Sequence, residues 1–283
     1  MTKDVVGWSA RCLGSEPIGI DVIETRRGGS GCPVAIVAAP IGGVRRRFVV
    51  KVYETGFDDY SRLGARDTAR KHALALERLA AEGIPVPRLV ARCEEGSGAA
   101  IVVEEVARIG APLDRRRAAA TLAHLHRIYW RGLDPSLAGL IGRSRPNRDR
   151  IRHGVVAMAR NCDRAHPDWR SARPDLAVVV GDVTGTPEPD RHRAALQHGD
   201  FFGANFIPSA GTEVIIDWDL LAGGDPMWDL GHLIAADPVL DATPDPIVDA
   251  YRGAGGSYDA AMLRYRLLCW EAFWGLRRLL EAD

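Results

Sequence analysis

The first part of the chain carries the pattern of an antiparallel β-sheet. Three runs rich in apolar and β-branched residues are separated by short segments with turn-forming glycines and a proline. Runs of this length, bounded by turn signals, are typical of strands. The three predicted strands cover residues 18–25, 34–38 and 48–53.

Alternation along the third run assigns its side chains to two faces. Phe48, Val50 and Val52 share one face, whereas Lys51 and Tyr53 share the other. A lysine inside an otherwise apolar strand costs free energy unless it is paired. Lys51 is therefore a candidate functional residue, and a lysine on an edge strand is the simpler alternative.

The pattern then becomes mainly helical. A helix is expected over residues 65–82 and ends at Gly83, after which extended chain leads to a short apolar strand at 99–103. Beyond this strand, apolar positions recur with helical spacing, and Asp114 is a candidate N-cap. The further predicted helices cover residues 115–128, 152–162, 225–236 and 258–280.

This change of pattern predicts an α+β protein with two domains. Residues 1–106 form a β-rich N-terminal lobe. Residues 107–283 form a mainly helical C-terminal lobe.

Composition and charge are those of an ordinary globular protein. The 283 residues include 37 Lys+Arg and 37 Asp+Glu, and this balance argues against a general nucleic-acid-binding protein. The five cysteines are spaced too widely for a CxxC site, so we expect no disulfide framework and a reducing compartment. We find no signal peptide or membrane span in the pattern, and we expect a cytoplasmic protein without a membrane partner.

The densest group of chemistry-bearing residues lies between positions 197 and 219. Asp200, Asn205 and Asp217 accompany two apolar runs that a Ser-Ala-Gly-Thr turn separates. A hairpin centred near Gly211 predicts that Asn205 lies opposite Asp217, with their Cβ atoms about 5 Å apart. Two oxygen-bearing side chains at such a distance can share a hard cation such as Mg²⁺, which takes few protein ligands together with substrate phosphates.

Asp200 precedes this hairpin closely enough to accept a proton from a hydroxyl held beside a metal-bound phosphate. This is the arrangement of phosphoryl transfer, in which a carboxylate orients the hydroxyl and Mg²⁺ neutralises the phosphates. For Asn205 or Asp217 alone, a turn-forming side chain that bonds its own backbone is the simpler interpretation. The whole set favours catalysis.

Three motifs follow one another between residues 198 and 230. They read His-Gly-Asp with an asparagine five positions after the Asp, then Ile-Asp-Trp at 216–218, then Gly-Asp-Pro-x-x-Asp-Leu at 224–230. Together they resemble the aminoglycoside phosphotransferase and choline kinase family. The resemblance implies a bilobal protein-kinase-like fold, with an antiparallel-sheet N-lobe and a mainly helical C-lobe, and a kinase that uses ATP and Mg²⁺.

The resemblance also implies a role for each matching residue. Asp200 looks like the catalytic base, and Asn205 and Asp217 look like the Mg²⁺ ligands. Asp229 is similar to a carboxylate that supports the catalytic loop. His198 is expected to orient the backbone of this loop rather than to act on the substrate.

The N-lobe contains the matches to the nucleotide site. Lys51 matches the lysine that holds the α- and β-phosphates of ATP. Gly29 and Ser30 lie in a glycine-rich turn that resembles the nucleotide-positioning loop, although such a turn is also an ordinary hairpin connection. Glu104 to Val106 resemble the inter-lobe segment whose backbone binds adenine.

One position departs from the family pattern. The family usually places a glutamate on the N-lobe helix to pair with the strand lysine, and here His72 stands at that position. Asp67 and Glu77 are each five residues away, about 140° around the helix, so neither replaces it simply. The sequence leaves the partner of Lys51 open.

The expected reaction is transfer of the γ-phosphate of ATP to a hydroxyl of a small molecule, such as an aminoglycoside or another antibiotic, in a resistance role. Residues 141–195 hold eleven Arg against seven acidic residues, whereas residues 231–283 hold five Arg against eight. Acidic walls would suit a polycationic aminoglycoside and an Arg-rich insertion an anionic or neutral acceptor, while a solvated face explains both. We expect a monomer or a homodimer.

Two other functional classes stay open. A metal-dependent phosphoesterase would use His198, Asp200, Asp217 and His232 as ligands to two metals, but it leaves Lys51 unexplained. A non-catalytic nucleotide-binding scaffold of kinase shape would fit the histidine on the N-lobe helix. Hydrolysis of a phosphodiester without ATP would favour the first class, and nucleotide binding without transfer the second.

Overall fold

The chain folds into two compact units. Unit 1 comprises Met1–Leu113, Arg131–Arg145 and Phe206–Leu221, and unit 2 comprises Asp114–Trp130, Pro146–Asn205 and Ala222–Asp283. The sequence pattern predicted a single domain boundary after residue 106. Unit 1 also contains the two later segments, Arg131–Arg145 and Phe206–Leu221. The computed structural model describes residues 2–14, 19–27, 32–54, 63–107, 112–143, 150–186, 195–209, 212–235 and 245–282.

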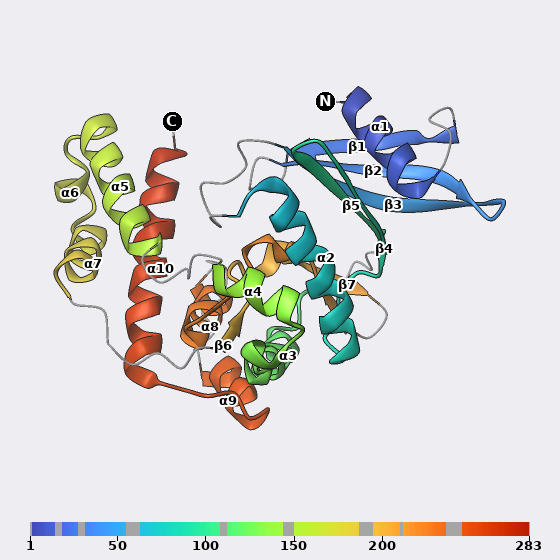
Figure 1. Ribbon diagram of the computed structural model, residues 1–283. Helices are drawn as coiled ribbons and strands as arrows, with labels where there is room; N and C mark the ends of the chain where they lie inside the picture. Colours follow the sequence, from blue (N-terminus) through green and yellow to red (C-terminus); the bar gives the residue numbers. More distant parts are fainter. Residues whose placement is uncertain are drawn as a thin grey trace. The chain divides into compact units, whose positions relative to one another are not determined.

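Unit 1 is built on a five-stranded antiparallel sheet (Figure 1). The order of strands across the sheet is β1-β2-β3-β5-β4. The strands are β1 (Asp21–Arg27), β2 (Pro33–Ile41), β3 (Val44–Tyr53), β4 (Leu89–Glu95) and β5 (Gly98–Glu104). Four of these were predicted from their apolar runs. β4 was not, because every residue of this edge strand is at least partly exposed and its pattern is weakly apolar.

The two faces of the sheet are covered by different helices. Helix α1 (Thr2–Leu13) packs on the face that carries Phe48, Val50 and Val52. Helix α2 (Ala65–Ala81) packs on the face that carries Tyr53. The predicted division of β3 between two faces is confirmed, and it puts Lys51 on the side of α2.

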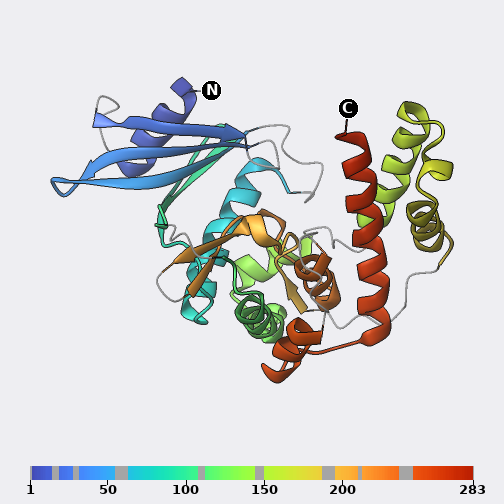
Figure 2. The same ribbon diagram turned by 180° about the vertical axis from the view of Figure 1, so that it is seen from behind.

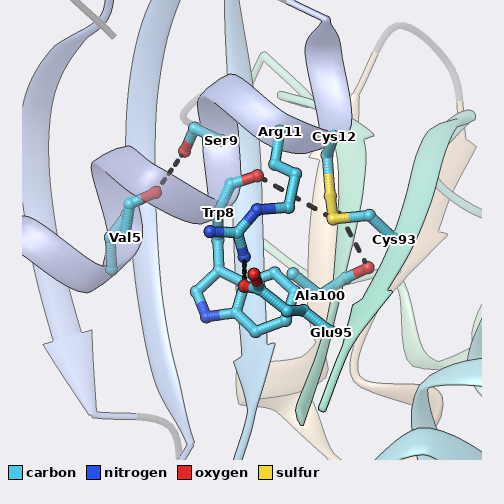
Figure 3. Close-up of a disulfide and its surroundings, with 8 residues drawn as sticks. All are labelled: Val5, Trp8, Ser9, Arg11, Cys12, Cys93, Glu95 and Ala100. Carbon is cyan, nitrogen blue, oxygen red and sulfur yellow. Dashed lines mark hydrogen bonds and ion pairs between the residues drawn. A yellow bond between two sulfur atoms is a disulfide. The ribbon is translucent and has the colours of Figure 1, made fainter.

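A disulfide joins α1 to the edge strand β4. Cys12 and Cys93 are 81 positions apart in sequence, and their Cα atoms lie 5.2 Å apart (Figure 3). Arg11 forms an ion pair with Glu95 beside them and lies 4.8 Å from the centre of the Trp8 ring. The widely spaced cysteines led us to expect no disulfide framework, and this one disulfide forms because packing of α1 on the sheet brings together two cysteines that lie far apart in sequence.

The remaining elements of unit 1 are α4 (Pro135–Arg143), β7 (Phe206–Ser209), β8 (Thr212–Ile215) and the 3₁₀ helix η5 (Trp218–Leu220). Helix α4 was not predicted. Asp134 Oδ1 accepts the backbone N–H of Ser136 at 2.9 Å, and Pro135 occupies the first helical position. This Asp-Pro start is the same signal that correctly predicted the helix after Asp225.

Unit 2 is mainly helical. The long C-terminal helix α10 packs against α5, α7 and α8, and Figure 2 shows α5 and α7 along its side. Helix α3 packs against α9, α8 and β6. The elements are α3 (Arg115–Arg127), α5 (Arg150–Ala165), α6 (Trp169–Ala172), α7 (Pro174–Gly185), β6 (Ala195–Gln197), η4 (Gly203–Asn205), β9 (Ala222–Gly224), α8 (Pro226–Ala235), α9 (Asp245–Gly253) and α10 (Ala260–Leu280). A 3₁₀ helix η2 (Trp130–Gly132) lies where the two units join in sequence.

The four helices predicted for this part of the chain are all present. Asp114 caps α3 as expected, since its Oδ1 accepts the backbone N–H groups of Arg116 and Arg117. Helices α6, α7 and α9 were not predicted. In the described part of the chain, every helix is too short or too polar to cross a membrane.

Candidate active site

Lys51 on β3 is paired with two carboxylates inside unit 1. Its Nζ lies 2.5 Å from Asp217 Oδ1 and also contacts an oxygen of Asp219. Burial by itself lowers the pKa of a lysine, but the two carboxylates more than offset this effect and raise the pKa of Lys51 well above its ordinary value. These contacts answer the question of its partner that the sequence left open.

Asp219 is a buried carboxylate that the sequence analysis did not single out. Tyr53 Oη donates a hydrogen bond to Asp219 Oδ1 at 2.7 Å, and His72 Nδ1 lies 2.9 Å from the same oxygen. Burial raises the pKa of a carboxyl, but Lys51 and His72 overcome this and hold the pKa of Asp219 well below its usual range. An acidic residue between Trp218 and Leu220 in an apolar run was the signal that could have marked it.

Asp217 has an unusual backbone conformation that turns the chain from β8 into η5. Its φ is 66° and its ψ 56°, and among the described residues it is the one non-glycine residue with positive φ. Asp tolerates this left-handed region better than most residues. The turn lets Asp217 and Asp219 both reach Lys51.

The hairpin before Asp217 has a register different from the one predicted. Ser209 lies opposite Thr212, and the ladder ends where Phe206 faces Ile215. The expected pairing of Asn205 with Asp217 is therefore not part of the ladder. The reason is local, since η4 precedes the first strand and the left-handed turn follows the second.

Helix α2 also contacts the segment after Asp217 through Lys71. Its Nζ donates a hydrogen bond to the backbone oxygen of Leu221 at 2.8 Å. Burial lowers the pKa of Lys71 to about 8, and the carboxylate of Asp219 partly counters this effect. Two consecutive residues of α2, Lys71 and His72, thus hold the segment that carries Asp219.

In unit 2, Asp200 lies on the loop after β6. Asn205 Nδ2 donates to the backbone oxygen of Asp200 at 2.7 Å and to its Oδ2 at 2.9 Å. The backbone N–H of Asp200 donates to His198 Nδ1 at 3.2 Å, and Asp200 Oδ1 lies 3.7 Å from His232 Nδ1. The Asp200 side chain is 34% exposed, so its carboxylate is oriented yet within reach of a substrate.

Asp229 on α8 holds the backbone of the same loop. Its two carboxylate oxygens accept the backbone N–H groups of His198 at 2.8 Å and Gly199 at 2.9 Å. His126 Nε2 lies 3.4 Å from Oδ2. Gly199 has a φ of 89°, a conformation that L side chains rarely adopt, so this turn needs glycine.

A buried ion pair fixes the start of α8, and sequence reasoning missed one of its members. Arg266 on α10 donates from Nε to Asp225 Oδ2 at 2.8 Å, and Asp225 Oδ1 accepts the backbone N–H of Met227 at 2.9 Å. Gln197 Nε2 donates to the backbone oxygen of Asp225. Through these contacts Asp225 joins α10, the start of α8 and strand β6, which precedes the Asp200 loop.

His232 is packed between aromatic rings. Its ring stacks on Trp270 with a centroid distance of 3.7 Å and on Phe202 with a centroid distance of 4.9 Å. His198, in turn, accepts the backbone N–H of Asp200. Both histidines thus have packing or orienting roles beside Asp200.

The predicted nucleotide-binding residues are described only in part. Gly29 and Ser30 lie outside the described residues. Glu104 ends β5, where its backbone N–H donates to Arg88 O at 3.0 Å and its side chain forms an ion pair with the Arg88 guanidinium. Val106 follows the end of this strand.

Comparison with known proteins agrees with the family resemblance found in the sequence. The sequence matches the phosphotransferase enzyme family over residues 41–268. No curated protein sequence matches the chain.

Solved structures of kinases resemble the whole chain. A spectinomycin phosphotransferase in complex with ADP and spectinomycin has 16% identity and a TM-score of 0.66, covering 99% of this chain and 89% of that one. An aminoglycoside-3'-phosphotransferase of type VIII has 22% identity and a TM-score of 0.60, covering 96% and 98%. A choline kinase from Streptococcus pneumoniae has 15% identity and a TM-score of 0.56, covering 93% and 86%.

These likenesses confirm the predicted fold class, with an antiparallel sheet in one unit and mainly helices in the other. The family match covers more than three quarters of the chain, and the expectation of a phosphotransferase is confirmed: the chain belongs to the phosphotransferase enzyme family.

Proposed function

We propose that this protein transfers the γ-phosphate of ATP to a hydroxyl group of a small molecule in a Mg²⁺-dependent reaction. One observation carries the proposal. Asp200 presents a partly exposed carboxylate whose rotation Asn205 fixes and whose backbone neighbours are bound by Asp229. A carboxylate that is oriented but accessible suits a general base for an incoming hydroxyl.

In the proposed reaction, Asp200 accepts the proton of the acceptor hydroxyl as its oxygen attacks the γ-phosphorus. The bond between the γ-phosphorus and the β–γ bridging oxygen breaks, and ADP leaves. The product is a phosphate monoester of the acceptor. Catalysis of this kind depends mainly on positioning and on charge stabilisation.

Lys51 is the proposed contact for the α- and β-phosphates. Its raised pKa keeps the ammonium group charged at physiological pH. We assign nucleotide contacts also to Gly29, Ser30 and the backbone of Glu104 to Val106. The resemblance to a kinase that was solved with ADP supports nucleotide use.

Asn205 and Asp217 are the proposed Mg²⁺ ligands, and their contacts fit this role. The Asn205 amide nitrogen donates to Asp200, so its amide oxygen is the group that a cation would use. The Asp217 side chain is 28% exposed and carries a carboxylate, the hard ligand that Mg²⁺ prefers. Bound there, the ion would neutralise charge on the phosphate oxygens.

The proposed acceptor is an antibiotic or a related small molecule, and the proposed role is resistance in the cytoplasm. Support comes from relatives named as aminoglycoside, spectinomycin and macrolide phosphotransferases. We propose that the chain works as a monomer or homodimer, with an N-terminal nucleotide lobe and a C-terminal acceptor lobe.

The test is incubation with ATP and Mg²⁺ against a panel of hydroxyl acceptors, read by mass spectrometry for the addition of one phosphate. The panel contains aminoglycosides, aminocyclitols, macrolides, nucleoside and peptide antibiotics, and amino alcohols. A phosphorylated product would support the proposal and name the acceptor class. Hydrolysis of a phosphodiester without ATP, and no transfer to any acceptor, would contradict it.

A further inference from the structure

Asp219 has the contacts of a residue that holds the nucleotide-binding lysine in place. We propose that Asp219 is a positioning residue, which anchors Lys51 for the phosphates of the nucleotide, in the place of a carboxylate from helix α2. This inference rests on the proposed function, because it takes Lys51 to be the phosphate contact.

The two carboxylates beside Lys51 differ in their exposure. The Asp217 side chain is 28% exposed, whereas the Asp219 side chain is 3% exposed. An exposed carboxylate that also serves a cation cannot hold the lysine by itself throughout the reaction, because its charge is shared with that cation. Asp219 is withdrawn from solvent, and its carboxylate contacts Lys51 and accepts a hydrogen bond from Tyr53.

Asp219 is itself held on several sides within unit 1. Tyr53, two residues after Lys51 on the same face of β3, donates to Asp219 Oδ1 at 2.7 Å. Strand β3 thus supplies both a cation and a hydroxyl donor to one carboxylate. Trp218 Nε1 donates to the backbone oxygen of Ile215 at 2.9 Å, which fixes the turn that carries Asp219.

Two residues of helix α2 contact Asp219 or the segment that carries it. His72 Nδ1 lies 2.9 Å from Asp219 Oδ1, and Lys71 binds the backbone of Leu221 at the end of the same segment. A carboxylate at position 72 would lie beside Asp219, and two adjacent carboxylates cannot both ionise without a large cost. A histidine on the helix and an aspartate in η5 are therefore a matched pair. The structure thereby explains why α2 carries no acidic residue at this position.

The test is the affinity for ADP, measured by isothermal titration calorimetry with Mg²⁺ and again with EDTA. Asp219→Asn keeps the shape of the side chain and removes its charge. We expect it to weaken ADP binding about tenfold or more in both conditions, because a charged hydrogen-bond partner of Lys51 is lost. Asp175→Asn, which removes an exposed carboxylate on α7, is the matched control and is expected to bind like the wild type.

Two further variants separate positioning from general damage. Lys51→Met is expected to lose the same affinity, and adding Asp219→Asn to it is expected to cost nothing more, because both changes remove one interaction. His72→Glu combined with Asp219→Asn moves the carboxylate onto α2 and is expected to restore most of the affinity. This double variant also keeps a carboxylate partner for Lys51, so it tests the inference even where Asp219→Asn alone fails to fold.

Each other result has a distinct meaning. Wild-type affinity in Asp219→Asn would overturn this inference alone, as would a loss seen only with Mg²⁺, which would make Asp219 a metal ligand. Additive losses of affinity from Asp219→Asn and Lys51→Met would also overturn it. So would a folded variant with both His72→Glu and Asp219→Asn that binds ADP no better than Lys51→Met. Wild-type protein that binds no ADP at all would overturn the proposed function and this inference with it.

Discussion

Asp229 accepts a hydrogen bond from the backbone N–H of Gly199 at 2.9 Å, across 30 positions of sequence. Its other carboxylate oxygen accepts the N–H of His198. Asp229 is fully buried, so this carboxylate is committed to shaping the loop that presents Asp200. The loop that carries Asp200 is therefore held from α8, by a side chain that takes no part in the proposed proton transfer.

Asp229→Asn should weaken both the fold and the turnover. The amide turns one acceptor oxygen into a donor that faces a backbone N–H, and we expect a loss of about 1–3 kcal/mol in the free energy of unfolding. Chemical denaturation and turnover assays measure the two effects. Asp182→Asn on the exposed face of α7 is the control. Unchanged stability and unchanged turnover in Asp229→Asn would mean that the loop is held by other contacts.

Gly224→Ala tests the close packing at the start of the Gly-Asp-Pro motif. A Cβ at Gly224 would lie 2.6 Å from Gln197 Cδ, in a buried side chain that donates to Asp225. We expect overpacking to lower the free energy of unfolding by about 1–3 kcal/mol. Gly139→Ala in α4 is the matched control, because a Cβ there meets open space and should stabilise the helix by about 0.5–1 kcal/mol. Equal stabilities of the two variants would contradict this account of the motif.

The buried Lys71 makes stability depend on pH in the alkaline range. Its pKa is about 8 in the folded protein, against an ordinary value of 10.5, so between these values the unfolded chain binds more protons. The free energy of unfolding contributed by Lys71 should therefore rise with pH across this window, by about 3 kcal/mol. Lys71→Met removes the term, so denaturation of both proteins from pH 7 to 11 isolates it. A constant difference between them over this range would show that Lys71 titrates normally.

The disulfide between Cys12 and Cys93 predicts a definite count of thiols. Alkylation under denaturing, non-reducing conditions should modify three cysteines, namely Cys32, Cys162 and Cys269. After reduction it should modify all five. Mass spectrometry of the intact protein gives the count directly, and five modified cysteines before reduction would mean that the purified protein holds both thiols reduced.

Local signals predicted part of this structure. Strand β3 contains a run of aromatic and β-branched residues that follows a turn, and α8 starts with Asp225-Pro226, so both could be located without any knowledge of their neighbours. The pattern of edge strand β4 is weak, because all of its residues are at least partly exposed. Helix α1, which packs on the sheet, was not among the predicted elements.

In the candidate site, too, local sequence predicts some residues and not others. The motif around Asp200 is contiguous in sequence and could be predicted, although its roles stay predictions until they are measured. Asp219 could not be found in this way, because its meaning comes from contacts with Lys51, Tyr53 and His72, which lie far away in sequence. The register of the hairpin between β7 and β8 was missed because a 3₁₀ helix precedes its first strand and a left-handed residue follows its second.

The role of Asp200 is tested by comparing wild-type protein with Asp200→Asn in ATP-dependent phosphorylation of the acceptor that the panel identifies. We expect turnover to fall by about a hundredfold or more, while ADP binding is retained, because only the proton acceptor is lost. Unchanged turnover in Asp200→Asn would show that this carboxylate is not the catalytic base.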